Sequence, residues 1–332
     1  MTAIIEAEGL TKVYPPSTKA VDDVSFSIDE GEIFGFLGPN GAGKTTTIKM
    51  LTTLSSITRG KGIVGGYDVG KNPNEVRRII GLVSQDLTVD SGLTGMENLL
   101  LSARLYHVSD RDARQRARTL LELVGLEQAS ARMAGTYSGG MKKRLELISG
   151  LIHEPKVLFL DEPTLGLDIQ TRSAMWQYIN GISKEKKVTI FLTTHYLEEA
   201  DSLCDRVAII DRGQIKVSGP PSELKSQTGA NILNVEVSGG RDLVSVLLST
   251  DGVTEVKRAG NRYSIRMKGI DPSLQDVFHT LSDQGVKVVD AKIEKSSLDQ
   301  VFLEVTGRTM RDEVVNPGDA FEMQARAKGR GN

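Results

Sequence analysis

The chain has 332 residues, and its 41 lysines and arginines nearly balance 43 aspartates and glutamates, giving a net charge of −2 at pH 7. This length predicts about two domains, and the charge balance excludes a globally basic nucleic-acid-binding protein. No apolar run reaches the roughly 18 residues that a membrane-spanning helix needs, and the first residues lack the pattern of a signal peptide. We therefore expect a cytoplasmic chain with no nucleic-acid partner. Cys204 is the single cysteine, which excludes an internal disulfide.

Residues 4–219 predict an α/β domain. Short β-rich apolar runs alternate here with helical patterns, as in a sheet whose strands are buried on both faces. The expected strands are residues 33–37, 79–83, 157–160, 188–192 and 207–210. From about residue 92 to 135 helical signals replace the strands, beginning with a capping box at Ser109-Asp-Arg-Asp112, so we expect an all-helical insertion. Its arginines are interpreted as the solvated face of an amphipathic helix.

A second domain is expected after the Gly219-Pro-Pro221 boundary, over residues 229–306. The pattern there is strand (232–237), helix (242–248), two strands around 259–261, helix (272–281) and strand (286–293). This order, β-α-β-β-α-β, predicts a small α+β domain of the ferredoxin-like type. A last helix is expected at 298–305, and the polar residues 309–332 are expected to form a disordered tail.

A glycine-rich string follows the predicted strand 33–37 and opens a helical run, which is the context of a phosphate-binding loop. Glycines let successive backbone N–H groups and the helix N-terminus point at phosphates, Lys44 adds a positive charge, and the Thr45 hydroxyl is placed to hold Mg²⁺. The alternative is a glycine turn before an ordinary helix. The predicted nucleotide-binding residues of this loop are Gly38, Pro39, Asn40, Gly41, Ala42, Gly43, Lys44, Thr45 and Thr46.

Two carboxylates, Asp161 and Glu162, directly follow the apolar strand 157–160. Ligands of open α/β sheets bind at this carboxyl edge, so Asp161 is predicted to support Mg²⁺ and Glu162 to orient an attacking water. In isolation the pair would be interpreted as a cap for the following turn. Beside a phosphate-binding loop it indicates hydrolysis of a nucleoside triphosphate.

The remaining landmarks resemble, in identity and order, those of ABC transporter ATPases, over about residues 4–219. Tyr137-Ser138-Gly139-Gly140-Met141 is similar to the family signature Leu-Ser-Gly-Gly-Gln, and it departs from it at Tyr137 and Met141. Ser138 and the amides of Gly139 and Gly140 begin a predicted helix, 141–152, whose dipole can face a γ-phosphate. A serine-capped helix without a ligand is the alternative.

The resemblance assigns roles to four further residues. Gln85 matches the family glutamine that senses Mg²⁺ and water, and His195 matches the histidine that contacts the γ-phosphate and steadies the catalytic glutamate. Asp168 matches the loop that communicates across the dimer, although it is equally a turn residue. Tyr14 matches the aromatic position on which adenine stacks. The expected catalytic set is thus Glu162, His195, Lys44 and Gln85, and the expected metal-binding set is Thr45, Gln85 and Asp161.

The family resemblance implies an ATPase, with ATP and Mg²⁺ as cofactors, that powers transport through an integral membrane permease on a separate chain. It implies a homodimer with ATP at the interface, held peripherally on the cytoplasmic face of the cell membrane. The segment Ser297-Leu-Asp-Gln-Val-Phe-Leu-Glu-Val-Thr-Gly307 resembles the extension of drug-resistance exporter ATPases of the daunorubicin type. The implied cargo is a drug-like, lipid or polysaccharide compound.

Two alternatives stay open. The first is a soluble non-transport ABC ATPase acting in translation or nucleic-acid metabolism. Translation-type members carry two cassettes, whereas this chain has one phosphate-binding loop. Repair-type members insert a long coiled coil, and the interval from Lys44 to Tyr137 is too short to hold one. The second is a regulatory ATP-binding module without turnover. The intact set of Lys44, Asp161, Glu162 and His195 argues against it.

Overall fold

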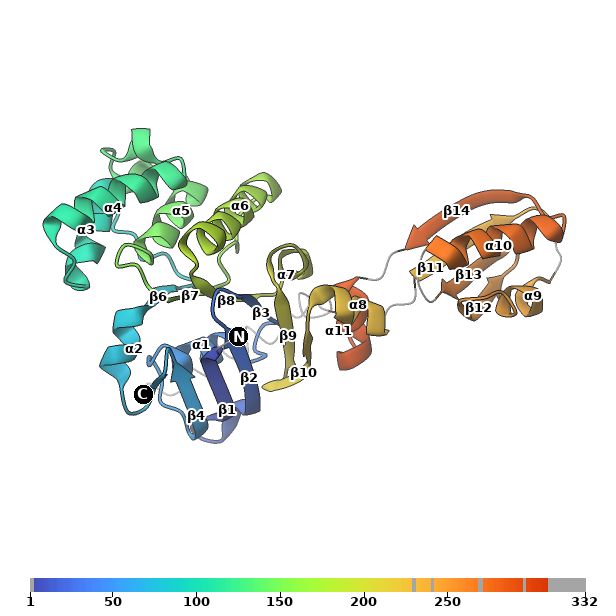
Figure 1. Ribbon diagram of the computed structural model, residues 1–332, viewed down its shortest axis with the longest axis horizontal. Helices are drawn as coiled ribbons and strands as arrows, with labels where there is room; N and C mark the ends of the chain where they lie inside the picture. The colour runs from blue at the N-terminus through green and yellow to red at the C-terminus, as the bar shows by residue number, and fades with distance from the viewer. Residues whose placement is uncertain (1–2, 229–230, 240–241, 268–270, 295–296, 310–332) are drawn as a thin grey trace, which may run out of the picture. The chain divides into compact units, whose positions relative to one another are not determined.

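The computed structural model describes residues 3–228, 231–239, 242–267, 271–294 and 297–309 (Figure 1). Contacts between residues divide the described chain into a unit that ends at Pro220 and a second unit, Pro221–Thr309. The tail expected over residues 309–332 lies, beyond Thr309, outside the described residues. Each unit has its own hydrophobic core.

The first unit is built on a six-stranded sheet with the order β10-β9-β3-β8-β7-β6. Four adjacent strands run parallel, namely β3 (Ile33–Leu37), β8 (Thr189–Thr194), β7 (Val157–Asp161) and, at the edge, β6 (Ile80–Val83), and β9 (Arg206–Asp211) is parallel to β3. The edge strand β10 (Gln214–Gly219) is antiparallel to β9. Every residue of β3, β7 and β8 is buried, as the continuous apolar runs predict for strands covered on both faces.

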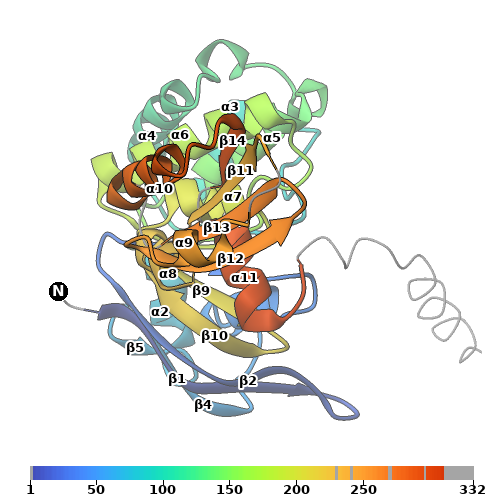
Figure 2. The same cartoon turned by 90° about the vertical axis from the view of Figure 1, so that its right-hand side faces the viewer.

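The first unit also contains a second, antiparallel sheet, which the sequence pattern did not predict. It has the order β2-β1-β4-β5, formed by β1 (Ala3–Tyr14), β2 (Thr18–Asp29), β4 (Arg59–Val64) and β5 (Tyr67–Asp68). Figure 2 shows β1, β2 and β4 side by side. Its apolar residues, such as Ile5 and Leu10, share one core with Phe34 and Phe159 of the parallel sheet.

The helices of the first unit include the expected insertion. It consists of α3 (Gly95–Leu105), α4 (Asp110–Leu123) and the short 3₁₀ helices η1 (Glu127–Ala129) and η2 (Ala134–Thr136). Ser109 caps α4 by accepting from the Asp112 N–H at 3.2 Å, but the reciprocal capping box lies instead on α3, between Thr94 and Glu97. The other helices are α1 (Lys44–Leu51), α2 (Pro73–Ile79), α5 (Gly139–Ser149), α6 (Ile169–Lys186) and α7 (Leu197–Leu203).

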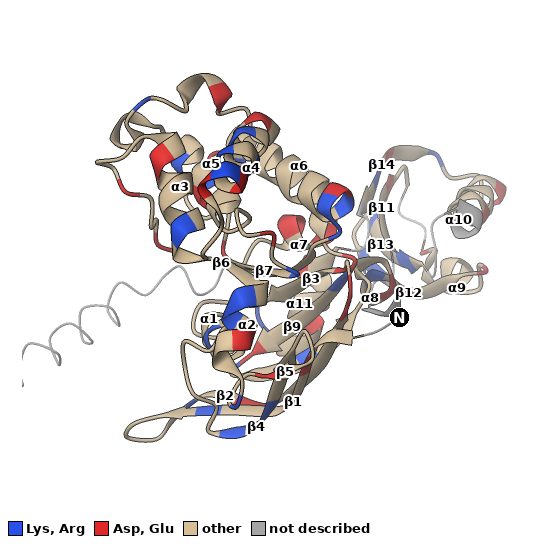
Figure 3. Cartoon of the chain, turned by 60° about the vertical axis from the view of Figure 1, so that its left-hand side comes forward, with Lys and Arg blue, Asp and Glu red and all other residues tan. Residues whose placement is uncertain are grey.

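Basic and acidic residues are mixed along the helices of the insertion, as Figure 3 shows. Arg104 pairs with Asp110 at 3.5 Å, and Arg116 pairs with Glu154 at 2.6 Å. These arginines therefore lie on a solvated face with acidic neighbours, as predicted.

The second unit has the predicted β-α-β-β-α-β order. Its elements are β11 (Asn231–Val237), α9 (Val244–Leu248), β12 (Val253–Ala259), β13 (Arg262–Met267), α10 (Asp271–Asp283) and β14 (Val288–Glu294). The antiparallel sheet has the order β12-β13-β11-β14, which is the strand order of a ferredoxin-like fold. The expected last helix is present as α11 (Leu298–Thr306), and it contacts α8 (Pro221–Thr228), a helix that the sequence pattern did not predict.

Candidate functional site

The predicted phosphate-binding loop connects β3 to α1. Two of its glycines, Gly41 and Gly43, adopt φ angles of 78° and 108°, in the left-handed region that favours glycine. A Cβ on Gly43 would lie 2.5 Å from the Ala20 carbonyl oxygen, so no larger residue fits there. Gly43 is also the N-cap of α1 and offers no side chain to its first amides. The helix N-terminus therefore presents free N–H donors and a positive dipole end, which suits a phosphate group.

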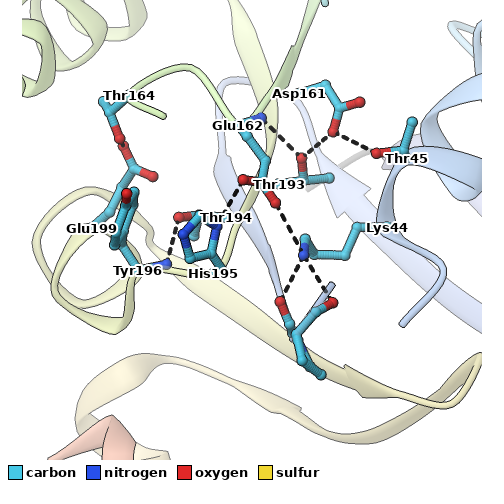
Figure 4. A network of polar contacts seen from close by, with 12 residues as sticks. Lys44, Thr45, Asp161, Glu162, Thr164, Thr193, Thr194, His195, Tyr196 and Glu199 are labelled. Carbon is cyan, nitrogen blue, oxygen red and sulfur yellow. Dashed lines mark hydrogen bonds and ion pairs between the residues drawn. The ribbon is translucent and has the colours of Figure 1, made fainter. Parts of the chain in front are cut away.

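Lys44 turns back over this loop. Its ammonium donates to the carbonyl oxygens of Gly38 at 2.7 Å and Pro39 at 3.1 Å, and it pairs with Glu162 Oε1 at 3.1 Å (Figure 4). Both charged side chains are buried, with exposed fractions of 5% and 7%. In this geometry the Glu162 carboxylate is the buried counter-ion of the Lys44 ammonium.

Asp161, the last residue of β7, contacts the first turn of α1. Its Oδ1 accepts from the Thr45 hydroxyl at 3.1 Å and from the Thr193 hydroxyl at 2.6 Å. Two oxygen donors, a hydroxyl and a carboxylate, thus lie beside the phosphate-binding loop. Hard oxygen ligands of this kind are those that Mg²⁺ prefers.

Glu162 and His195 form a second close contact at the same edge of the sheet. His195 Nδ1 lies 2.7 Å from Glu162 Oε2, and the backbone of Glu162 has a φ of 50°, a conformation that costs a non-glycine residue about 1 kcal/mol or more. Burial raises the pKa of Glu162, but the hydrogen bond from His195 and the charge of Lys44 outweigh it and hold the pKa below its usual value. The carboxylate is therefore ionised at neutral pH and can accept a proton from water.

The Ser138-Gly139-Gly140 segment begins α5. Ser138 is the N-cap and accepts from the Met141 N–H at 3.3 Å, so the helix starts two residues before its predicted position. A Cβ on Gly139 would meet no atom within 4 Å, which leaves this N-terminus open to a ligand. Among the described residues, this segment makes no hydrogen bond to Lys44, Asp161 or Glu162.

Comparison with known proteins identifies the family. The model of the family "ABC transporter" matches residues 21–165, and that of "ATP-binding protein DrrA1-3-like, C-terminal domain" matches residues 219–306. The daunorubicin resistance ATP-binding protein DrrA2 of Streptomyces coeruleorubidus is 40% identical over 91% of this chain and 95% of its own length. The chain belongs to the ABC transporter ATP-binding proteins.

Solved structures of ABC ATPases have the same fold as the first unit. A structure titled as the ATP binding subunit of an ABC transporter covers 68% of this chain and 92% of its own, with 31% identity and a TM-score of 0.60. The dimeric structure of MJ0796, a bacterial ABC transporter cassette, covers 65% of this chain and 98% of its own, with 25% identity and a TM-score of 0.60.

The comparisons confirm several predictions from the sequence. The fold is an ABC ATPase core with a helical subdomain and a C-terminal α+β domain, and the chain is an ATP-binding subunit with ATPase activity. Within the described ranges, no helix combines the length and the hydropathy needed to cross a bilayer. The roles of individual site residues stay predictions.

Two predicted residues of the ABC site lie apart from its polar cluster. Gln85 follows β6 with an exposed side chain, and its backbone carbonyl accepts from Lys143 at 2.9 Å. Tyr14 ends β1, 37% exposed, with the ammonium of Lys12 5.1 Å from its ring centre. Among the described residues, neither side chain has a hydrogen bond or ion pair to Lys44, Asp161, Glu162 or His195. Gln85 and Tyr14 can therefore take part in the site only by contacting ATP or its metal ion directly.

The link between the Gln85 segment and α5 was not predicted. Glu146 of α5 is 3% exposed and accepts from both the N–H and the hydroxyl of Thr88, at 2.9 and 3.0 Å. Lys143, one turn earlier, lies 3.7 Å from Glu146 and holds the Gln85 carbonyl. Burial raises the pKa of Glu146, while the Thr88 amide and Lys143 oppose this effect. A charged pair three residues apart on a helix usually lies at the surface, so no sequence pattern predicts this buried contact.

Proposed function

We propose that this chain hydrolyses Mg-ATP at the interface of a homodimer and thereby drives export of a drug-like, lipid or polysaccharide compound through a separate membrane subunit. The observation that carries the chemistry is a pair of neighbouring polar clusters at the carboxyl edge of a parallel sheet. One is Thr45–Asp161 and the other is Lys44–Glu162–His195. These five side chains come from α1, β7 and the segments that follow β7 and β8.

Thr45 and Asp161 fit a magnesium ion. Mg²⁺ takes few protein ligands and completes its shell with water and substrate phosphates, so one hydroxyl and one carboxylate 3.1 Å apart form a sufficient pair. When bound there with ATP, the ion would offset charge on the phosphates. Thr193 fixes the orientation of Asp161 through their 2.6 Å hydrogen bond.

Glu162 and His195 divide the work of activating water. Glu162 is ionised and buried, so it can orient a water molecule and accept part of its proton. His195 holds the Glu162 carboxylate through Nδ1, and its other ring nitrogen is proposed to contact the γ-phosphate. Lys44 is the group that ATP must recruit, because its ammonium exchanges Glu162 for phosphate oxygens on binding. Gln85 is proposed to contact Mg²⁺ and water, and Tyr14 to stack on adenine.

The dimer follows from the position of the signature segment. Ser138, Gly139 and Gly140 begin α5 with an accessible helix N-terminus, which suits the γ-phosphate of an ATP held by a second copy. The dimeric MJ0796 cassette supports this arrangement. We expect Glu162→Gln protein to form a stable dimer in Mg-ATP by light scattering, and the dimer to be lost when Lys44→Ala is added. A Glu162→Gln protein that is monomeric at saturating ATP would overturn the proposed homodimer with ATP at its interface.

Export is supported by the resistance ATP-binding proteins among its relatives. A groove at the end of α3 also exposes apolar side chains, with Leu105 of α3 72% exposed and Leu54, which follows α1, 62% exposed. We propose that this groove receives the membrane subunit, which would hold the chain on the cytoplasmic face of the membrane. The test is affinity purification of the tagged chain from its own membranes, with Leu105→Asp as the matched variant.

The expected result is a multi-helix membrane protein in near-equal amount that is lost with Leu105→Asp. Ribosomes or nucleic acid in its place would favour the alternative, a soluble ABC ATPase acting in translation or nucleic-acid metabolism.

A further inference from the structure

A buried carboxylate outside the proposed site lies directly behind it. Glu199, in the first turn of α7, has an exposed fraction of 0%. Its Oε1 accepts from the Thr164 hydroxyl at 2.8 Å and from the Trp176 indole N–H at 3.0 Å. Figure 4 shows Glu199 between Thr164 and the His195–Tyr196 segment.

The two donors come from separate segments. Thr164 stands two residues after Glu162. Trp176 belongs to α6 and anchors the carboxylate to that helix. Glu199 itself lies on α7, which begins two residues after His195, and the Thr194 hydroxyl accepts from the Tyr196 N–H at 2.9 Å just before that helix. One carboxylate thus links the segment that follows Glu162 to the helix that follows His195.

Burying the Glu199 carboxylate costs folding free energy. Desolvation raises the pKa of Glu199, which its hydroxyl and indole donors only partly offset. Its Oε2 is buried and has no hydrogen-bond partner among the described residues. An apolar side chain of similar volume would avoid this desolvation, so the carboxylate is poorly explained by stability alone. Its two directional contacts do fit a role in fixing geometry.

We propose that Glu199 is a positioning residue for ATP hydrolysis, which ties the Thr164 segment to α7, the helix that follows His195, so that Glu162 and His195 keep their 2.7 Å contact. This inference rests on the proposed function of Glu162 and His195. Glu199 touches neither of them in its side chain, and it acts through the backbone next to each. Its loss should therefore lower kcat and leave ATP affinity nearly unchanged, because misplacement of a catalytic group by a fraction of an ångström slows chemistry more than binding.

The experiment measures kcat and ATP affinity for the full chain in four variants. Glu199→Leu removes the acceptor, Glu199→Gln keeps an oxygen in its place, Thr164→Val removes one donor with little change in volume, and Glu198→Gln, at the exposed neighbouring position, is the matched control. We expect kcat to fall about tenfold or more in Glu199→Leu and several-fold in Thr164→Val. Glu199→Gln should retain most of the wild-type kcat, the control all of it, and ATP affinity should stay within about twofold throughout.

A double variant separates positioning from a general structural role. In a Glu162→Gln background, adding Glu199→Leu should cause no further loss of the residual turnover, because the group it positions is already inactive. Wild-type kcat in both Glu199→Leu and Thr164→Val would overturn the inference, as would an equal loss in Glu199→Leu and Glu199→Gln. If Glu199→Leu does not fold, Thr164→Val decides alone. An inactive wild-type chain, or one whose turnover survives Glu162→Gln, would instead refute the proposed function.

Discussion

Removing the charge of Glu162 should tighten nucleotide binding. In the structure, Lys44 is held by Glu162 Oε1 at 3.1 Å and by two loop carbonyls, so an incoming phosphate competes with the carboxylate for the ammonium. Glu162→Gln replaces a charged acceptor by a neutral one of the same shape. Breaking the contact between Lys44 and residue 162 then costs less free energy, and the negative charge that repels an incoming phosphate is absent.

The size of the effect follows from the burial of the pair. Both side chains are more than nine-tenths buried, so solvent screens the contact little. A hydrogen bond to a charged group contributes about 1.5–3 kcal/mol, which corresponds to about ten- to hundredfold in Kd. Part of this gain is offset because the glutamine amide still accepts from Lys44, so the lower end of the range is the expected value.

ADP is the suitable ligand, because it cannot be turned over and lacks the γ-phosphate that the proposed dimer binds. Isothermal titration calorimetry in Mg²⁺ should give an ADP Kd about tenfold lower for Glu162→Gln than for the wild type. Glu198→Gln, which removes the same charge at an exposed position, should match the wild type. An unchanged or weaker Kd in Glu162→Gln would refute the competition between carboxylate and phosphate for Lys44.

Three further outcomes are expected. Glu146→Leu should lose about 2–4 kcal/mol of unfolding free energy in urea, because it strands the Thr88 donors and Lys143, whereas Glu146→Gln should lose less than about 1 kcal/mol. Burial lowers the pKa of His153, so below about pH 6.5 the unfolded chain binds a proton that the folded chain does not. The unfolding free energy should therefore fall as the pH is lowered from about 7 to 5, and it should fall less steeply in His153→Phe. Equal slopes for the two proteins would contradict this. Tyr14→Ala should weaken ATP binding about tenfold while Tyr14→Phe retains it, and equal affinities of all three proteins would exclude adenine stacking.

Local patterns predicted the fold where a strand or helix carries its own signal. The period-2 and helical patterns of residues 232–305 gave the β-α-β-β-α-β order, and the all-apolar runs gave β3, β7 and β8. The antiparallel sheet of β1, β2 and β4 was not predicted because β2 mixes polar and apolar residues and because β1 pairs with the distant strand β4. Helix α8 was not predicted because Pro220 and Pro221 suggested a linker, although proline at a first helical position is favourable.

The candidate site divides in the same way. The phosphate-binding loop and the Asp161–Glu162 pair were predictable because their geometry follows from a few residues after a strand. The contacts that the sequence could not reveal join distant segments. Glu199 stands in an acidic first turn, Leu-Glu-Glu-Ala-Asp, that is typical of a solvated helix start, and only tertiary packing buries it.

The central claim is that Glu162 activates the water that cleaves ATP bound to this chain. It is tested most directly by measuring phosphate release from Mg-ATP by the purified wild-type protein and by Glu162→Gln under saturating ATP. The account predicts turnover by the wild type and a loss of about a hundredfold or more in Glu162→Gln, which still binds ATP. Equal phosphate release by the two proteins would contradict it.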